Sequence, residues 1–294
     1  MFNAFYEGCV EYGRKGDGVK KILKILTVFL IVVIILLCTA FDNRLKIVNY
    51  EIETDSILNC VKIALIADLH CCLYGENQLE LIDAIDNYNP DAVLLAGDIF
   101  DDYYINDNSY ILINNLVQRY KTYYVSGNHE WWSGNMYEYF EYLKDAGVTV
   151  LRGDCDYLTV NDDTIIISGV DDPEVNIYDT SYKTYEEQLE TALDNISSEY
   201  YKVLLAHRPE NAKQYFEHDY DLVLSGHAHG GQGRIPLILN GFYSPNQGFF
   251  PELAGGIYEF DNRKMIVSRG LSRENTVIPR IFNRPELVFV SLTN

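Results

Sequence analysis

Short polar motifs, each placed directly after an apolar run, constrain the fold of this chain more than any other feature. Five of its six histidines lie in these motifs. The motifs are Asp68-Leu69-His70, Gly97-Asp98-Ile99-Phe100-Asp101, Gly127-Asn128-His129-Glu130, the single His207 and Gly226-His227-Ala228-His229. Open α/β sheets place their binding sites beyond the carboxyl ends of the strands. The repeated order of apolar run and polar motif therefore predicts one shared site at the edge of an α/β sheet.

The side chains of these motifs carry the donor atoms of a metal site. Asp, Asn and His supply oxygen and nitrogen ligands, which suit manganese, iron or zinc better than calcium or copper. One such motif alone is more often a turn than a ligand. All of them together, each with an apolar run before it, predict a protein that binds two divalent metal ions.

The rest of the pattern predicts an α/β fold. Apolar runs of strand length alternate with helical patterns at first, and shorter strands follow. The expected strands are 61–67, 92–96, 123–125, 148–151, 157–160, 164–169, 203–206, 222–225, 256–260, 264–268 and 287–292, and the expected helices are 76–88, 109–120, 135–146 and 184–198. Two half-sheets packed face to face, with helices outside, account for this order.

An apolar segment near the amino terminus predicts one transmembrane helix over residues 22–41, after a short segment of residues 1–21. Ile25 to Phe41 carries no charge, and such a helix spans about 26–30 Å, enough for a bilayer core. The alternatives are a buried core helix, which the lack of a polar face disfavours, and a cleaved signal peptide. The long polar lead favours a retained anchor.

Basic residues flank this segment unequally. Five lie before it or in its first turn, against Arg44 and Lys46 on the other side. The five are Arg14, Lys15, Lys20, Lys21 and Lys24. The positive-inside rule then predicts a single-pass protein of the cell membrane with a cytoplasmic amino terminus, and an extracytoplasmic domain over residues 42–294.

Charge limits the partners of that domain. Residues 1–41 hold five of the 23 Lys and Arg and three of the 43 Asp and Glu, so the remainder carries a formal charge of −22. This argues against binding nucleic acid through an extended basic face. A phosphate substrate is compatible with this charge, because two divalent cations would outweigh the two carboxylates expected as ligands, Asp68 and Asp98.

The order and spacing of the motifs, over nearly all of residues 60–230, resemble those of the calcineurin-like metallophosphoesterases. Gly230-Gly231-Gln232 and Ser268-Arg269-Gly270-Leu271 resemble the membrane-associated bacterial branch of that family, which includes relatives acting on lipid-linked or cell-envelope phosphates. The resemblance implies a four-layer α/β/β/α sandwich. It also implies hydrolysis of phosphodiester, phosphomonoester or pyrophosphate bonds by a hydroxide that bridges two metal ions.

The resemblance also assigns roles by position. One metal would be held by Asp68, His70 and His229, and the other by Asn128, His207 and His227. Asp98 would bridge them. His129, oriented by Asp101, would protonate the leaving group as a general acid, although a histidine that only shapes its loop is the alternative.

The substrate would be a phosphorylated small molecule, a lipid or an envelope phosphate. A non-enzymatic metal-binding scaffold of the same fold and a nuclease are the alternative functions, and the acidic domain disfavours the nuclease. Other residues keep two interpretations, one functional and one structural: Cys71 and Cys72 beside His70, Trp131 and Trp132, and Arg269. His218 is expected at the surface.

Overall fold

The computed structural model of the protein describes residues 2–273 and 278–294. The chain divides into two compact units, Met1–Asp42 and Asn43–Asn294. The first unit is one helix, α1 (Phe2–Ala40), whose segment Lys20–Ala40 is long and apolar enough to cross a membrane. The apolar segment is therefore helical as expected. The helix also continues through the polar residues before it.

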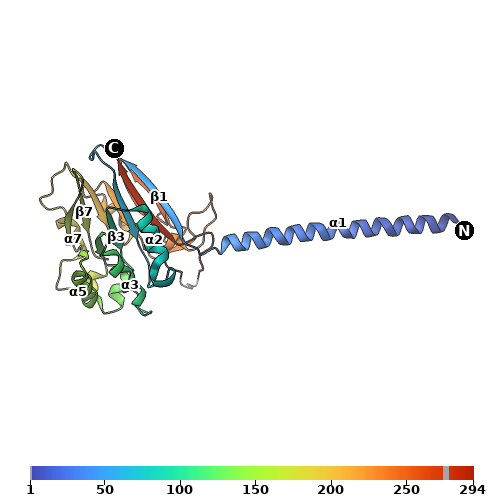
Figure 1. The fold of residues 1–294 in the computed structure, drawn as a ribbon, viewed down its shortest axis with the longest axis horizontal. Helices are drawn as coiled ribbons and strands as arrows, with labels where there is room; N and C mark the ends of the chain where they lie inside the picture. The colour runs from blue at the N-terminus through green and yellow to red at the C-terminus, as the bar shows by residue number, and fades with distance from the viewer. Residues whose placement is uncertain (1, 274–277) are drawn as a thin grey trace. The chain divides into compact units, whose positions relative to one another are not determined.

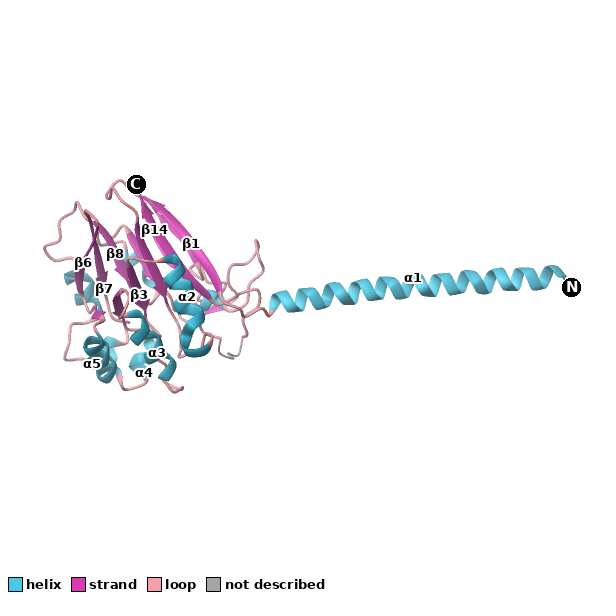
Figure 2. Ribbon diagram, in the orientation of Figure 1, coloured by secondary structure: helices cyan, strands magenta, loops and turns pink. Residues whose placement is uncertain are grey.

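The second unit contains two six-stranded sheets, drawn as arrows in Figure 2. The first sheet has the strand order β1-β14-β2-β3-β4-β5, and the second has the order β12-β13-β9-β8-β7-β6. The bounds in the first sheet are β1 (Lys46–Glu53), β14 (Glu286–Thr293), β2 (Val61–Ile66), β3 (Ala92–Ala96), β4 (Lys121–Val125) and β5 (Thr149–Val150). Those in the second are β12 (Gly256–Phe260), β13 (Arg263–Val267), β9 (Leu222–Ser225), β8 (Tyr201–Leu205), β7 (Asp163–Gly169) and β6 (Asp154–Val160).

The helices of this unit are short. Together with three 3-10 turns they connect the strands, and α2, α3 and α5 are labelled in Figure 1. The α-helices are α2 (Leu79–Tyr88), α3 (Asp107–Leu116), α4 (Asn128–Trp132), α5 (Met136–Ala146), α6 (Val175–Tyr178), α7 (Tyr185–Thr191) and α8 (Ala212–Tyr215). The 3-10 turns are η1 (Glu76–Gln78), η2 (Pro209–Asn211) and η3 (His229–Gly231), and a small hairpin pairs β10 (Tyr243–Ser244) with β11 (Gly248–Phe249).

The central strands are apolar on both faces because each face packs in a separate apolar cluster. Ile63 and Leu65 of β2 pack with Val203 and Leu205 of β8 in one cluster between the sheets. The alternate residues of these strands pack against the helices in a second cluster. Since side chains alternate along a strand, helix-covered strands must be apolar throughout. The arrangement confirms the expected α/β fold of two face-to-face sheets with helices outside.

Some elements differ from the sequence prediction. The helix expected over 184–198 ends at Thr191, because Asn195 adopts a left-handed backbone with φ 62° that no α-helix continues through. Its start agrees, since Thr184 caps it by accepting a hydrogen bond from the Glu187 amide. The edge strand β1 and the hairpin β10–β11 were not expected. Within the described part of the chain, β1 pairs only with β14, and most of its residues are exposed or half-buried. Its sequence therefore contains no apolar run.

Candidate metal centre

The predicted site residues follow the carboxyl ends of five strands. Asp68 and His70 follow β2, Asp98 follows β3, and Asn128 begins α4 just after β4. In the second sheet, His207 follows β8, and both His227 and His229 follow β9. β2, β3 and β4 are parallel neighbours, as are β8 and β9, so these loops gather at one end of the sheets. The structure thus brings the predicted ligands together.

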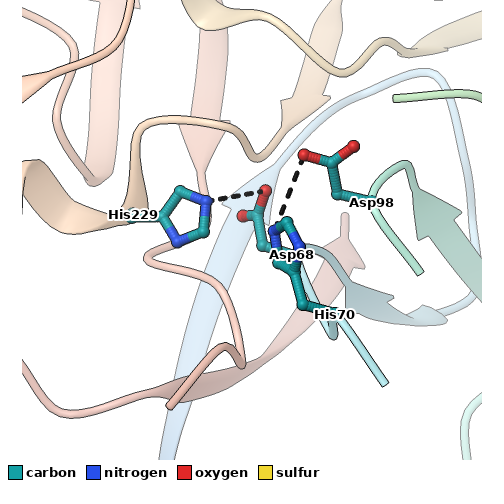
Figure 3. Close-up of side chains that lie close together, drawn as sticks. All are labelled: Asp68, His70, Asp98 and His229. Atoms are coloured by element: carbon teal, nitrogen blue, oxygen red, sulfur yellow. Dashed lines mark ion pairs between the residues drawn. The ribbon is translucent and has the colours of Figure 1, made fainter. Parts of the chain in front are cut away.

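Four of these side chains form a first cluster, shown in Figure 3. They are Asp68, His70, Asp98 and His229, and one ligand atom of each lies within 4.8 Å of the others. His70 Nε2 is 3.6 Å from Asp98 Oδ2, and His229 Nε2 is 3.8 Å from Asp68 Oδ1. Both distances are longer than a hydrogen bond, so each pair of ligand atoms leaves room for a cation between them.

A second cluster shares Asp98 with the first. Asp98, His207 and His227 also offer ligand atoms within 4.8 Å of one another. His207 Nε2 is 3.1 Å from Asp98 Oδ2 and 3.2 Å from His227 Nδ1. Two ring nitrogens facing each other at this distance are typical of imidazoles that converge on one ligand. Asp98 is the one residue common to both clusters among the described residues.

The side chain of Asn128 gives evidence on whether these candidate ligands fit a cation. Its side chain is buried, and its Oδ1 has no hydrogen-bond partner among the described residues. A buried acceptor without a donor costs about 1–3 kcal/mol, and a divalent cation would remove that cost. Two carboxylates, one amide and four imidazoles are also ligands that manganese, iron and zinc accept. The residues present therefore fit a metal site.

The charges of the cluster depend strongly on one another. Burial acts to raise the pKa of Asp98, but the neighbouring His207 outweighs it and holds that pKa well below its usual range. Burial likewise opposes the charge on His207, yet Asp98 raises the pKa of this histidine to about 10. Burial, followed by the His207 charge, lowers the pKa of His227 to about 3. His227 is therefore a neutral imidazole near pH 7. Asp98 holds a proton on His207, and a cation bound at this histidine would have to displace that proton.

The backbone around the ligands is unusual. Five candidate ligands, all non-glycine, have positive φ angles between 44° and 64°. They are Asp68, His70, Asp98, His227 and His229. Such residues are uncommon in folded proteins and gather at functional sites, where the surrounding contacts hold them. The concentration of this conformation at the two clusters marks the functional site independently of the side chains.

Glu130 holds two of the ligand loops together. Its buried carboxylate accepts hydrogen bonds from the backbone amides of Asp98, Ile99, Phe100 and Gly127, at 2.8 to 3.1 Å. Burial, with the Asp98 charge beside it, raises the pKa of Glu130 to about 7. Glu130 belongs to one of the sequence motifs, but no role was predicted for it. Its four amide contacts show that it fixes the loop after β3 against α4.

His129 lies beside the first cluster. Its Nδ1 is 2.6 Å from Asp102 Oδ1 and 3.8 Å from Asp101 Oδ2. Asp101 Oδ2 instead lies 2.8 Å from His70 Nδ1. The expectation that Asp101 orients His129 therefore needs correction, because Asp102 makes the closer contact and Asp101 is bound mainly to His70. The ring of His129 stands edge-on to that of His70, with centroids 4.5 Å apart.

A cavity of about 460 Å³ adjoins the first cluster. Its lining combines ring, amide, apolar and cationic groups: His70, Cys71, Cys72, Tyr104, Ile105, Asn108 and Arg273. Cys71 is buried, and Cys72 Sγ accepts a hydrogen bond from the Arg273 amide. The two cysteines thus lie in the wall of this cavity.

The structure also shows the positions of Trp131, Trp132 and Arg269, for which the sequence left both a functional and a structural interpretation open. Trp131 is a core residue whose Nε1 donates to Ser126 Oγ, whereas Trp132 is exposed and contacts the His129 ring. Arg269 is buried and donates to the Gly255 carbonyl and Asn240 Oδ1, which is a structural role. His218 is half-buried and belongs to neither cluster.

Two six-stranded sheets with helices outside and an Asp/His cluster at their strand ends define the class of metal-dependent phosphoesterases. The chain belongs to the calcineurin-like phosphoesterase family, which matches residues 61–231. Family members are hydrolases of phosphoric esters, and they include proteins named metallophosphoesterase from bacteria and animals. The resemblance seen in the sequence is confirmed.

Individual relatives match over different lengths. A Bos taurus protein named transmembrane protein with metallophosphoesterase domain is 31% identical over 203 residues, which are 64% of this chain and 45% of that protein. The chain thus spans about half the length of this relative and of its Danio rerio counterpart. An uncharacterized metallophosphoesterase of Aquifex aeolicus is 29% identical over 255 residues, 84% of this chain and 92% of that protein.

A solved structure shows the same fold. The crystal structure of a Thermus thermophilus protein superposes with a TM-score of 0.50 and 13% identity. It covers 73% of this chain and 92% of that one. At this identity the likeness concerns the fold alone.

Proposed function

We propose that this protein is a membrane-anchored phosphoesterase that uses two divalent metal ions. The observation that carries the proposal is Asp98, which is shared by two separate groups of buried ligands. One ion would be held by Asp68, His70 and His229, and the other by Asn128, His207 and His227, with Asp98 between them. Two bound ions would lower the pKa of a water molecule and stabilise the negative charge on the phosphoryl oxygens.

The protein residues contribute position and proton transfer. Asp101 accepts from His70 Nδ1, so the opposite nitrogen, Nε2, is turned toward Asp98 and the cluster. Asp102 accepts from His129 Nδ1 in the same way. The His129 imidazole is partly exposed beside the cluster, where it would donate a proton to the departing oxygen of the substrate. Asp101 is thus assigned to the metal side of the site and Asp102 to the leaving-group side.

The substrate class is a phosphodiester, phosphomonoester or pyrophosphate. The cavity beside His70 is lined by Arg273, whose guanidinium pairs with Glu80 and stacks on Tyr74 and would turn from Glu80 to a bound phosphate. Tyr104 and Ile105 line the same cavity and would contact an apolar group of the same molecule. This mixture favours an amphipathic ester, such as a lipid or an envelope phosphate. We further propose that α1 is a single-pass anchor and that the domain lies outside the cytoplasm, because the basic residues crowd the amino side of the apolar segment.

The test is hydrolysis of aryl phosphate monoesters and diesters by the full chain in detergent, before and after metal removal. We expect activity that a chelator abolishes and added manganese restores. His218→Ala is a matched histidine control and should keep the activity, whereas His207→Ala should lose it. A chelated protein at full activity would contradict the proposal. So would a wild-type protein with both metals bound that hydrolyses no phosphomonoester, phosphodiester or pyrophosphate.

A further inference from the structure

A loop between the metal centre and the last strands exposes an unusual set of apolar side chains. Leu237 is fully exposed, and Ile238 is 82% exposed. Phe249 and Phe250 are also mostly exposed, at the far end of the same segment. We call residues 235–250 the apolar loop. Large apolar side chains gathered in this way mark a surface that binds an apolar partner or a membrane.

The backbone of the apolar loop is held in place. Ile235 and Leu239 pair with each other, and the Arg234 amide donates to the Ile281 carbonyl at 2.9 Å. The Phe250 amide donates to the Phe242 carbonyl, also at 2.9 Å. The loop therefore presents its apolar side chains on a fixed backbone. It does not fold them back into the core.

Hydrogen bonds place the base of this loop beside the first residues of the domain. Gly233, two residues before the apolar loop, pairs with Ile281. Arg284, three residues after Ile281, donates hydrogen bonds to the carbonyls of Arg44 and Leu45. Asn43 follows the last residue of α1, Ala40, by three residues, which is at most about 11 Å of chain. The apolar loop thus emerges at the end of the domain where the proposed anchor joins it.

Charge at this end of the domain also fits a lipid surface. Arg44, Lys46, Arg234 and Arg284 cluster here by sequence and by the contacts just given, in a domain that is otherwise strongly acidic. Basic residues next to an apolar segment are the pattern of proteins that sit at anionic headgroups. A negatively charged protein partner would explain the basic residues but not the apolar side chains. An apolar protein partner would explain the apolar side chains but not the basic residues, whereas a lipid surface explains both.

We propose that the apolar loop inserts its tip, Leu237 and Ile238, into the lipid surface on the side where the anchor emerges. The inference rests on the proposed membrane anchoring. The same loop carries Asn246, whose Oδ1 is 2.9 Å from His227 Nε2 in the metal centre. One continuous segment therefore connects the lipid surface with a candidate metal ligand, which favours substrates whose phosphate lies at that surface.

The experiment introduces a tryptophan into the full chain reconstituted in liposomes, either as Leu237→Trp or as Leu58→Trp. Leu58 is a matched control, because it is 78% exposed and lies beyond the opposite end of β1, about 26 Å away along that strand. Emission of wild-type protein, which contains Trp131 and Trp132, is subtracted. Insertion into the membrane should shift the added emission of Leu237→Trp to the blue, and brominated lipids should quench most of it. The emission of Leu58→Trp should show neither effect.

Two results would overturn the inference. Equal emission of both variants, without quenching, would show that the tip stays in water. A blue shift that grows with protein density and is insensitive to brominated lipid would show that a second copy of the chain covers the loop. Co-flotation of the protein with liposomes, measured in parallel, separates these outcomes from a failure of the anchor, in which neither variant floats. Circular dichroism confirms that both variants are folded.

Discussion

Asp101 and Asp102 are consecutive in the chain but contact different histidines. Asp101 Oδ2 is 2.8 Å from His70 Nδ1, and Asp102 Oδ1 is 2.6 Å from His129 Nδ1. A carboxylate behind a metal-binding histidine fixes its tautomer, and its loss typically weakens metal affinity about 10–100-fold. The two aspartates therefore form a natural pair for separating metal binding from proton transfer.

The first prediction compares Asp101→Asn with Asp102→Asn. Asp101→Asn should weaken metal affinity by about 10–100-fold, because it acts on a ligand. Asp102→Asn should leave metal affinity unchanged and lower kcat. Metal titration, followed by calorimetry, and kcat at saturating metal measure the two effects. The same affinity loss in both variants would show that the division between the two aspartates is wrong.

The second prediction concerns His129, which lies at the cluster without belonging to either set of proposed ligands. His129→Gln should keep its metals and lose about 10²–10⁴ in kcat for alkyl phosphates, whose leaving groups need a proton. For aryl phosphates the loss should be much smaller, because their anions leave without protonation. The comparison of the two substrates is the measurement. Equal losses would identify His129 as a residue that only shapes its loop.

Single residues show how far the sequence could be interpreted. The ligand types were predictable because several Asp and His motifs recur together, each directly after an apolar run, although one such motif alone is more often a turn. The sequence could not show whether Asp101 or Asp102 contacts His129. The side chains of adjacent residues point in different directions, and the backbone conformation of the loop determines which of them faces His129. Asn246 was also missed. It lies in a loop without a motif, and only the fold brings it to His227.

Among the larger elements, the glycine loops explain how the strands converge on one centre. Gly97 follows β3 with φ +81°, and an added Cβ would lie 2.7 Å from both His207 Nδ1 and the Gly127 amide. The loops of two sheets therefore approach more closely than side chains would allow. Gly134 has a similar φ of +73°, but a Cβ there would meet nothing within 4 Å.

The third prediction uses this pair. Gly134→Ala should cost only the backbone strain of a left-handed alanine, about 1–2 kcal/mol. Gly97→Ala should cost more than that and should also weaken metal binding, because His207 must move. Urea denaturation measures the first effect, and metal titration measures the second. If the two variants are equally stable, the close packing at Gly97 does not constrain the site.

The strands at the centre of each sheet were predictable, and the edges were not. β2 and β8 are apolar on both faces because the other sheet covers one face and helices cover the other, and such runs are visible in sequence. β1 contains Lys46, Glu51 and Glu53 and is mostly exposed, so its residues resemble a loop until β14 pairs with it. Tertiary pairing, which no local pattern encodes, creates this strand.

For the whole molecule, the proposed anchor and the acidic domain lead to the fourth prediction. The charge asymmetry predicts a cytoplasmic amino terminus and an outer domain. In intact cells, added protease should digest the domain and leave a tag at residue 1 protected. Permeabilised cells, in which both parts are accessible, are the control. Digestion of the tag alone would reverse the orientation, and an envelope substrate would then be excluded.

The central claim is that Asp98 joins two metal sites, and replacing it tests that claim most directly. Elemental analysis of the purified full chain should find two divalent ions in the wild type. Asp98→Asn keeps the size of the side chain and removes the shared charge, so it should lose both tightly held metals together with hydrolysis of aryl phosphates. An active Asp98→Asn protein that retains two tightly bound metal ions would contradict the account.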